Sequence, residues 1–157
     1  MDTKKSCCFT GHRHISNEDI LRVVAMLDEL IAEHIGKGFT RYLAGGALGF
    51  DTLAAQAVLR AREKNNGIKL VIVQPCRDQD VKWHEADKSE YRRILTAADE
   101  VICLSDHYYN GCMQKRNRYL VNNSGLCIAY MRDTRGGTAY TVQYAQKQNI
   151  PVINIGM

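Results

Sequence analysis

Long apolar runs and a strong charge bias are missing from this sequence, and prolines are few. No run approaches the roughly 18 apolar residues that a membrane span requires. The start, MDTKKSCCFTG, has no apolar segment of the kind that signal peptides contain. The two prolines, Pro75 and Pro151, both fall at the ends of expected elements. We therefore expect a cytoplasmic protein with no linker and no membrane partner.

The cysteine spacing of a zinc site is missing as well. The six cysteines include no CxxC pair, which excludes the usual zinc ribbons and fingers. A metal site is geometrically conceivable, because several candidate ligands would lie near one edge of the expected fold: His12, Cys76, His84, His107 and Cys112. Their pattern does not favour one, and in a reducing compartment we expect neither a metal nor a disulfide.

The charges are nearly balanced. The 21 basic and 17 acidic side chains give a net charge of +4 with histidine neutral. This excess suits an anionic ligand, but it does not by itself indicate a nucleic-acid-binding protein. We expect a small phosphate-containing partner in preference to a nucleic acid.

Apolar runs alternate with helical patterns along the whole chain. Six runs lack polar alternation, which is typical of strands buried on both faces of a parallel sheet. They cover residues 6–10, 41–44, 68–74, 100–105, 126–131 and 152–155. With five helical segments between them, the pattern predicts one domain over residues 1–157. Its fold class is α/β, with a doubly wound, mostly parallel six-stranded sheet and helices on both faces.

The expected helices have recognisable ends. Ser16 is the expected N-cap of the first helix, and Gly36 and Gly38 would end that helix. The second helix would begin at Asp51 or the next residue, and an Asp87-x-x-Glu sequence resembles a capping box for the third. The last two helices are expected at 112–122 and 138–148, with Thr138 as an N-cap.

The stretch AGGALGFD follows the second expected strand. Gly45 and Gly46 would let the backbone turn sharply and lie close to a ligand, and Gly49 would let helix and strand pack closely. The amides of residues 46–49 would then point to a helix start, where a phosphate is favoured. Asp51 would cap the helix or accept hydrogen bonds from a ribose hydroxyl. A tight turn with Asp51 as a cap alone is the alternative.

A second glycine-rich helix opening follows the fifth strand, in RGGT. Gly136 and Gly137 would free the backbone, and Arg135 would add charge-assisted contacts to an anion. In an open α/β sheet, ligands bind outside the carboxyl ends of the strands. Two such openings at one edge of the sheet therefore predict a shared phosphate site.

Other candidates follow the first and third strands. Arg13 would form a bidentate pair with a phosphate, and His12 would hydrogen-bond the ligand or serve a structural role. The long connection at 75–86 holds the single tryptophan, Trp83. Together with Tyr108 and Tyr109, it would stack on a nucleobase or pack against the protein.

These motifs resemble those of the SLOG superfamily. CCFTGHR, AGGALGFDTLAAQAV and GCMQKRNRYLVNNS followed by RGGTAYTVQYA together look like its YpsA-type branch and span nearly the whole chain. SLOG is a Rossmann-like group that includes the Lonely Guy phosphoribohydrolases, which cleave the N-glycosidic bond of cytokinin nucleotides. It also includes the DNA-processing protein A family, which binds single-stranded DNA. The resemblance implies a Rossmann-like domain and a homo-oligomer.

The resemblance leaves catalysis open. Met113 and Arg116 match the methionine and arginine of the Lonely Guy pattern, but Gln143 stands where that pattern has a glutamate. A glutamine cannot take up the proton that a carboxylate would in glycosidic cleavage. The candidates for a catalytic role are Arg116, Gln143 and Asp51.

The sequence thus predicts a sensor or regulatory module that binds a nucleotide or a nucleotide-derived ligand, ADP-ribose-like or a nucleoside monophosphate, and requires no cofactor. Nucleotide N-glycosidase activity is one alternative. Binding of single-stranded nucleic acid is another, but that function needs an extended basic groove, which a charge of +4 supports only weakly. The predicted ligand-binding residues are Gly11, His12, Arg13, Gly45, Gly46, Gly49, Asp51, Trp83, Arg116, Arg135, Gly136, Gly137 and Thr138.

Overall fold

A six-stranded sheet forms the centre of the computed structural model, which describes residues 3–157. The strands are β1 (Ser6–Gly11), β2 (Arg41–Ala44), β3 (Lys69–Gln74), β4 (Glu100–Cys103), β5 (Leu126–Tyr130) and β6 (Val152–Asn154). Their order is β4-β3-β2-β1-β5-β6, and every neighbouring pair is parallel. The predicted α/β class and Rossmann-like sheet are therefore confirmed.

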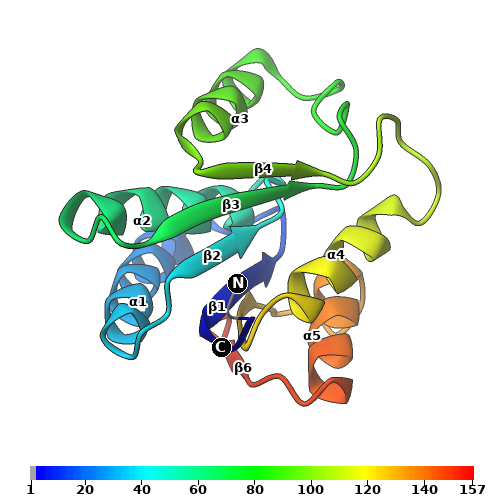
Figure 1. Ribbon diagram of the computed structural model, residues 1–157. Coiled ribbons are helices and arrows are strands. Elements are labelled where there is room, and N and C mark those ends of the chain that lie inside the picture. Colours follow the sequence, from blue (N-terminus) through cyan, green and yellow to red (C-terminus); the bar gives the residue numbers. More distant parts are fainter. Residues whose placement is uncertain (1–2) are drawn as a thin grey trace.

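Helices cover both faces of this sheet (Figure 1). On one face lie α1 (Asn17–Gly36), α2 (Phe50–Lys64) and α3 (Glu85–Ala97), which share one hydrophobic cluster with the strands. On the other face lie α4 (Cys112–Asn122) and α5 (Gly137–Lys147), which bury a second, smaller cluster. The central strands lack polar alternation because both of their faces are buried. Burial of apolar surface stabilises this arrangement by about 25 cal/mol for each Å² removed from water.

Several helix ends differ from the sequence-based expectation. Ser16 is the residue before α1, as predicted, but its side chain forms no capping hydrogen bond. The expected start of α3 at Asp87 is wrong, because the Lys88 amide already donates to the His84 carbonyl and the helix begins at Glu85. Thr138 is not the N-cap of α5; Gly136 takes that position and places Thr138 in the first turn.

The order of the strands changes direction at β1. The chain runs outward from β1 through β2 and β3 to β4, and α4 then carries it back across the sheet to β5, on the other side of β1. Loops that leave neighbouring strands in opposite directions open a crevice at the carboxyl edge. Figure 1 shows α2 and α4 on opposite sides of this position.

None of the helices within residues 3–157 has the length and apolar character that a membrane span requires.

Candidate functional site

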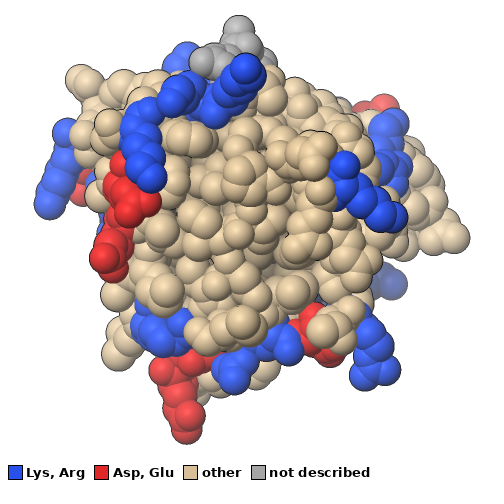
Figure 2. Space-filling model, turned by 90° about the horizontal axis from the view of Figure 1, so that it is seen from below, with Lys and Arg blue, Asp and Glu red and all other residues tan. Residues whose placement is uncertain are grey.

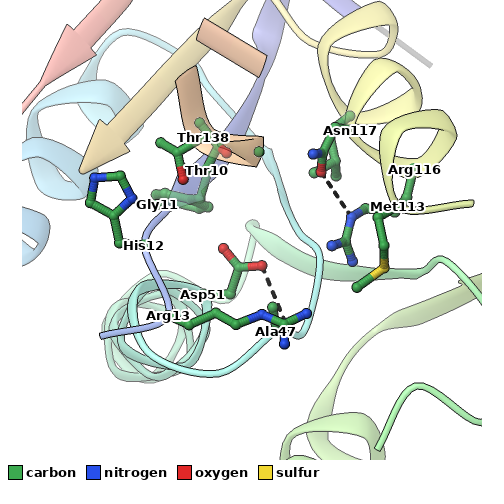
Figure 3. Close-up of a pocket in the computed structure, with 13 residues that line it drawn as sticks. Thr10, Gly11, His12, Arg13, Ala47, Asp51, Met113, Arg116, Asn117 and Thr138 are labelled. Atoms are coloured by element: carbon green, nitrogen blue, oxygen red, sulfur yellow. Dashed lines mark hydrogen bonds between the residues drawn. The ribbon is translucent and has the colours of Figure 1, made fainter. Parts of the chain in front are cut away.

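A cavity of about 320 Å³ lies at this switch point (Figure 3). We call it the switch-point cavity. Residues from the end of β1 and the loop after it, from the start of α2 and the turn before it, from α4 and from the first turn of α5 form its walls. They are Phe9, Thr10, Gly11, His12, Arg13, Ala47, Asp51, Met113, Arg116, Asn117, Leu120, Gly137 and Thr138. The two glycine-rich openings that the sequence singled out therefore meet at one cavity.

Arg116 supplies a fixed buried cation. Its side chain comes from α4, and the residue is only 4% exposed. Nη1 donates to the Gly45 carbonyl at 2.6 Å and to the Val73 carbonyl at 3.3 Å, while Nε donates to Asn117 Oδ1 at 3.1 Å. Burial lowers the pKa of this guanidinium, and the nearby Asp51 carboxylate opposes the shift. The side chain thus ties α4 to the ends of β2 and β3 and leaves Nη2 without a hydrogen bond within residues 3–157.

Asp51 is a buried carboxyl group in the wall of the same cavity. One of its oxygens accepts a hydrogen bond from the Ala47 amide at 3.2 Å, as the dashed line in Figure 3 marks. Burial raises the pKa of Asp51 to about 6, although Arg116 and Arg13 favour its charged form. The Ala47 amide, which the sequence assigned to a phosphate, is therefore held by the protein's own carboxyl group. Asp51 lies in the first turn of α2 and is not its cap.

The glycines of the turn before α2 pack against protein. A Cβ at Gly45 would collide with the Arg116 guanidinium. Gly49 has φ +77°, and a Cβ there would collide with the backbone of Arg13. Small residues are needed at these two positions because other parts of the chain approach closely, independently of any ligand. The turn forms the support behind the cavity, since Gly45, Gly46 and Gly49 are not among the lining residues.

Several other hydrogen-bond donors around the cavity are free. Within residues 3–157, the Arg13 guanidinium forms neither a hydrogen bond nor an ion pair, and the Thr10 and Thr138 hydroxyls have no partner. The amides of Gly137 and Thr138, in the first turn of α5, likewise have no acceptor among the described residues. Gly136 precedes them with φ +97° and provides no side-chain cap. Unpaired donors at a helix N-terminus form a site that favours an anion.

His12 lines the cavity and also connects two loops at this opening. Its Nε2 accepts hydrogen bonds from the Arg132 amide at 2.8 Å and the Asp133 amide at 3.2 Å. The ring also lies against Tyr130, with centroids 5.9 Å apart. An acceptor at Nε2 requires the proton of the neutral ring to be on Nδ1. His12 thus joins the loop after β1 to the loop that leads into α5.

Besides Gly45, Gly46 and Gly49, four other predicted site residues lie outside the switch-point cavity. Arg135 has a side chain 90% exposed and lies 3.9 Å from Asp133 Oδ1. Gly136 is exposed, and Gln143 is exposed further along α5. Trp83 lines a neighbouring cavity. Of the three catalytic candidates, the fold brings Asp51 and Arg116 together but leaves Gln143 apart from them.

The sequence reading missed two polar lining residues, Thr10 and Asn117. Thr10 is the residue before Gly11 at the end of β1, so the rule that ligands bind beyond strand ends would have found it. Asn117 follows Arg116 on α4 and carried no separate signal. Among residues 3–157, no group of three or more histidine, cysteine, aspartate or glutamate residues could hold a metal ion, and all six cysteines are free thiols.

Comparison with known proteins identifies the family to which the chain belongs. The model of the YspA SLOG family matches residues 8–154. The SPbeta prophage-derived protein YoqJ of Bacillus subtilis (strain 168) is 30% identical over 138 residues, which are 80% of this chain and 79% of YoqJ. UPF0398 protein BH1768 of Halalkalibacterium halodurans is 31% identical over 141 residues, or 88% of this chain and 73% of that protein.

Among solved structures, DNA processing protein A from Helicobacter pylori has the same fold, with a TM-score of 0.68 at 21% identity. That protein binds single-stranded DNA. The match covers 96% of this chain but 64% of the other, so this chain corresponds to a part of that protein. A likeness at this identity shows the fold alone, whereas the family match spans nearly all of the sequence. The motif resemblance is thereby confirmed, and the chain belongs to the YpsA-type branch, the YspA SLOG family.

Proposed function

We propose that this protein binds a nucleotide or a nucleotide-derived ligand, such as a nucleoside monophosphate or an ADP-ribose-like compound, as a sensor or regulatory module. The observation that supports the proposal most is the set of unpaired donors around the switch-point cavity. The Arg13 guanidinium, the Thr138 hydroxyl and two amides of α5 border one hollow. A phosphate accepts several hydrogen bonds at once, and charge-assisted bonds are about twice as strong as neutral ones.

The buried groups favour a ligand with both a phosphate and a sugar. Asp51 carries a charge above its pKa of about 6, so an anion in this cavity is better placed toward the first turn of α5 than beside Asp51. A hydroxyl group beside Asp51 would instead donate a hydrogen bond to its carboxylate. Asn117 has an amide nitrogen without a partner within residues 3–157. A phosphorylated ribose fits this arrangement, because its phosphate would accept from the free donors and a ribose hydroxyl would donate to Asp51.

Isothermal titration calorimetry with adenosine monophosphate and ADP-ribose tests the proposal. Arg13→Ala should weaken binding at least about tenfold, because a hydrogen bond to a charged group contributes roughly 1.5–3 kcal/mol. Arg135→Ala is the matched control: it removes an arginine of the same edge that lies outside the cavity. Equal losses in both variants, or no binding of either compound to the unsubstituted protein, would contradict the proposal.

Nucleotide N-glycosidase activity is a second candidate, favoured by Asp51 alone. A buried carboxyl group with a pKa of about 6 can exchange a proton near neutral pH. Gln143, which was also a catalytic candidate, lies outside the cavity. Chromatography of adenosine monophosphate incubations should then show free base that Asp51→Asn abolishes and Gln143→Ala leaves unchanged. Absence of free base with the unsubstituted protein would remove this candidate.

Single-stranded nucleic acid has support from the fold of DNA processing protein A alone. Figure 2 shows the face seen from below, where Lys and Arg side chains lie around the rim with acidic ones between some of them. Uncharged residues fill the middle of this face. Among the described residues it presents no continuous basic track of the kind that strand binding requires.

A further inference from the structure

A second cavity, of about 460 Å³, adjoins the first. We call it the Trp83 cavity. It shares two lining residues, Arg13 and Met113, with the switch-point cavity. The two hollows therefore lie on either side of these two side chains. A ligand held on one side of Arg13 can extend past it into the other.

The lining of the Trp83 cavity has a different chemistry. Besides Arg13 and Met113, it includes three aromatic or apolar side chains, Trp83, Tyr108 and Val81. The rest of the lining is Cys76, Asp78, Gln79 and Lys82. Tyr108 is 64% exposed and Val81 62% exposed, which are high values for large apolar groups. Exposed aromatic and apolar side chains that face one hollow are typical of a surface that binds a planar apolar group. The switch-point cavity, in contrast, presents the guanidinium, hydroxyl and amide donors described above.

The indole of Trp83 is held in place by the same framework that holds Arg116. Its ring lies 5.1 Å from that of Tyr91, edge to face. The Tyr91 hydroxyl accepts a hydrogen bond from Gln79 Nε2 at 2.8 Å, and this nitrogen also donates to the Gly45 carbonyl at 3.2 Å. Arg116 donates to the same carbonyl. Because a fixed aromatic ring loses little conformational entropy on binding, this support favours stacking.

Gln79 also offers an unused acceptor. Its Oε1 is buried and has no hydrogen-bond partner within residues 3–157, although the residue lines the Trp83 cavity. A buried amide oxygen without a partner destabilises the fold, so it needs an explanation such as an absent donor. The amino or ring N–H group of a nucleobase is a donor of this kind. A simple hydrocarbon or a second phosphate would not supply it.

We propose that the Trp83 cavity is the base subsite of the ligand whose phosphate the switch-point cavity holds. The inference rests on the proposed function and names a nucleobase as the planar part, stacked between the Trp83 and Tyr108 side chains and donating to Gln79. Arg13 and Met113 lie beside the sugar that joins the two parts. The ligand is therefore one nucleotide that spans both cavities.

Two probes separate this inference from the proposed function. Adenosine monophosphate has both parts, whereas ribose 5-phosphate has the phosphate and the sugar but no base. The protein contains a single tryptophan, so its fluorescence reports on Trp83 directly. We expect adenosine monophosphate to change this fluorescence and to bind about tenfold more tightly than ribose 5-phosphate, as stacking of one base on an aromatic side chain would give.

The matching variants are Trp83→Leu and the pair Tyr108→Ala and Tyr109→Ala. Trp83→Leu should lower the affinity for adenosine monophosphate to that for ribose 5-phosphate and leave the latter unchanged, which also shows that the fold is intact. Tyr108→Ala should weaken adenosine monophosphate binding several-fold. Tyr109→Ala should not, because this exposed neighbour does not line the cavity.

Three results would overturn the base subsite. One is equal affinity for the two probes with no effect of Trp83→Leu, in which case the phosphate site stands and the base subsite fails. Another is unchanged tryptophan fluorescence at saturating adenosine monophosphate. The third is a short single-stranded oligodeoxynucleotide that binds far more tightly than either probe, since one nucleotide would then not fill the two cavities. Failure of both probes to bind would instead overturn the proposed function beneath it.

Discussion

The buried carboxyl group of Asp51 makes this cavity sensitive to pH. Its pKa is raised to about 6 because burial disfavours the charge more than Arg116 and the Ala47 amide favour it. A raised pKa means that the folded protein binds this proton more tightly than the unfolded chain does. The contribution of Asp51 to stability is therefore greatest at acid pH and is lost as the pH rises through about 6. An anion in the same cavity should follow the same direction, since it is repelled by the charged carboxylate.

Sulfate tests this dependence, because its own charge is constant between about pH 5 and about pH 8 while Asp51 titrates. We expect the Kd for sulfate to increase about tenfold over that range in the unsubstituted protein, as one added charge at close distance would cause. Asp51→Asn keeps an acceptor for the Ala47 amide and should make the profile flat. Titration calorimetry at several pH values provides the measurement. A slope that persists in Asp51→Asn would assign the dependence to a group other than Asp51.

At the scale of elements, the turn between β2 and α2 sets the position of the whole cavity edge. Gly49 has a positive φ of +77°, and a Cβ at this position would overlap the backbone of Arg13. Its replacement must therefore move the loop after β1, which carries Arg13. The Phe50 amide, next in the chain, donates to the His12 carbonyl at 3.1 Å and fixes the same two segments together.

We expect Gly49→Ala to destabilise the protein by about 1–3 kcal/mol through backbone strain and displacement of that loop. Gly36→Ala serves as the control, because a Cβ at the end of α1 would meet no atom within 4 Å. This second change should be neutral or should stabilise the helix by up to about 1 kcal/mol. Urea denaturation of both variants measures the difference. Similar stabilities would mean that the turn adapts and that Gly49 is not needed for packing.

A feature of this structure could be predicted from the sequence when residues close together in the chain determine it. Strands and helices arise from local apolar patterns, so α4 was predicted at its observed ends and the strands within a few residues. The partners of His12 were not predictable, because its acceptor nitrogen meets amides 120 and 121 positions away in the sequence. The same holds for Asp51 and for Gly45, whose neighbours come from other elements. A motif indicates where a site lies, and tertiary contacts decide which of its residues face the ligand.

At the scale of the molecule, a ligand that binds only the folded chain must raise its thermal stability. A concentration of about 100 times the Kd contributes about 2.7 kcal/mol, and for a chain of this length each kcal/mol shifts Tm by about 2–4 °C. We therefore expect saturating adenosine monophosphate to raise Tm by about 5–10 °C in differential scanning calorimetry. Arg13→Ala at the same ligand concentration should show a much smaller shift while its Tm without ligand stays close to that of the unsubstituted protein, since its guanidinium has no partner within residues 3–157. A large loss of Tm in ligand-free Arg13→Ala would show instead that this arginine supports the fold, and the assignment of its charge to a bound anion would be wrong.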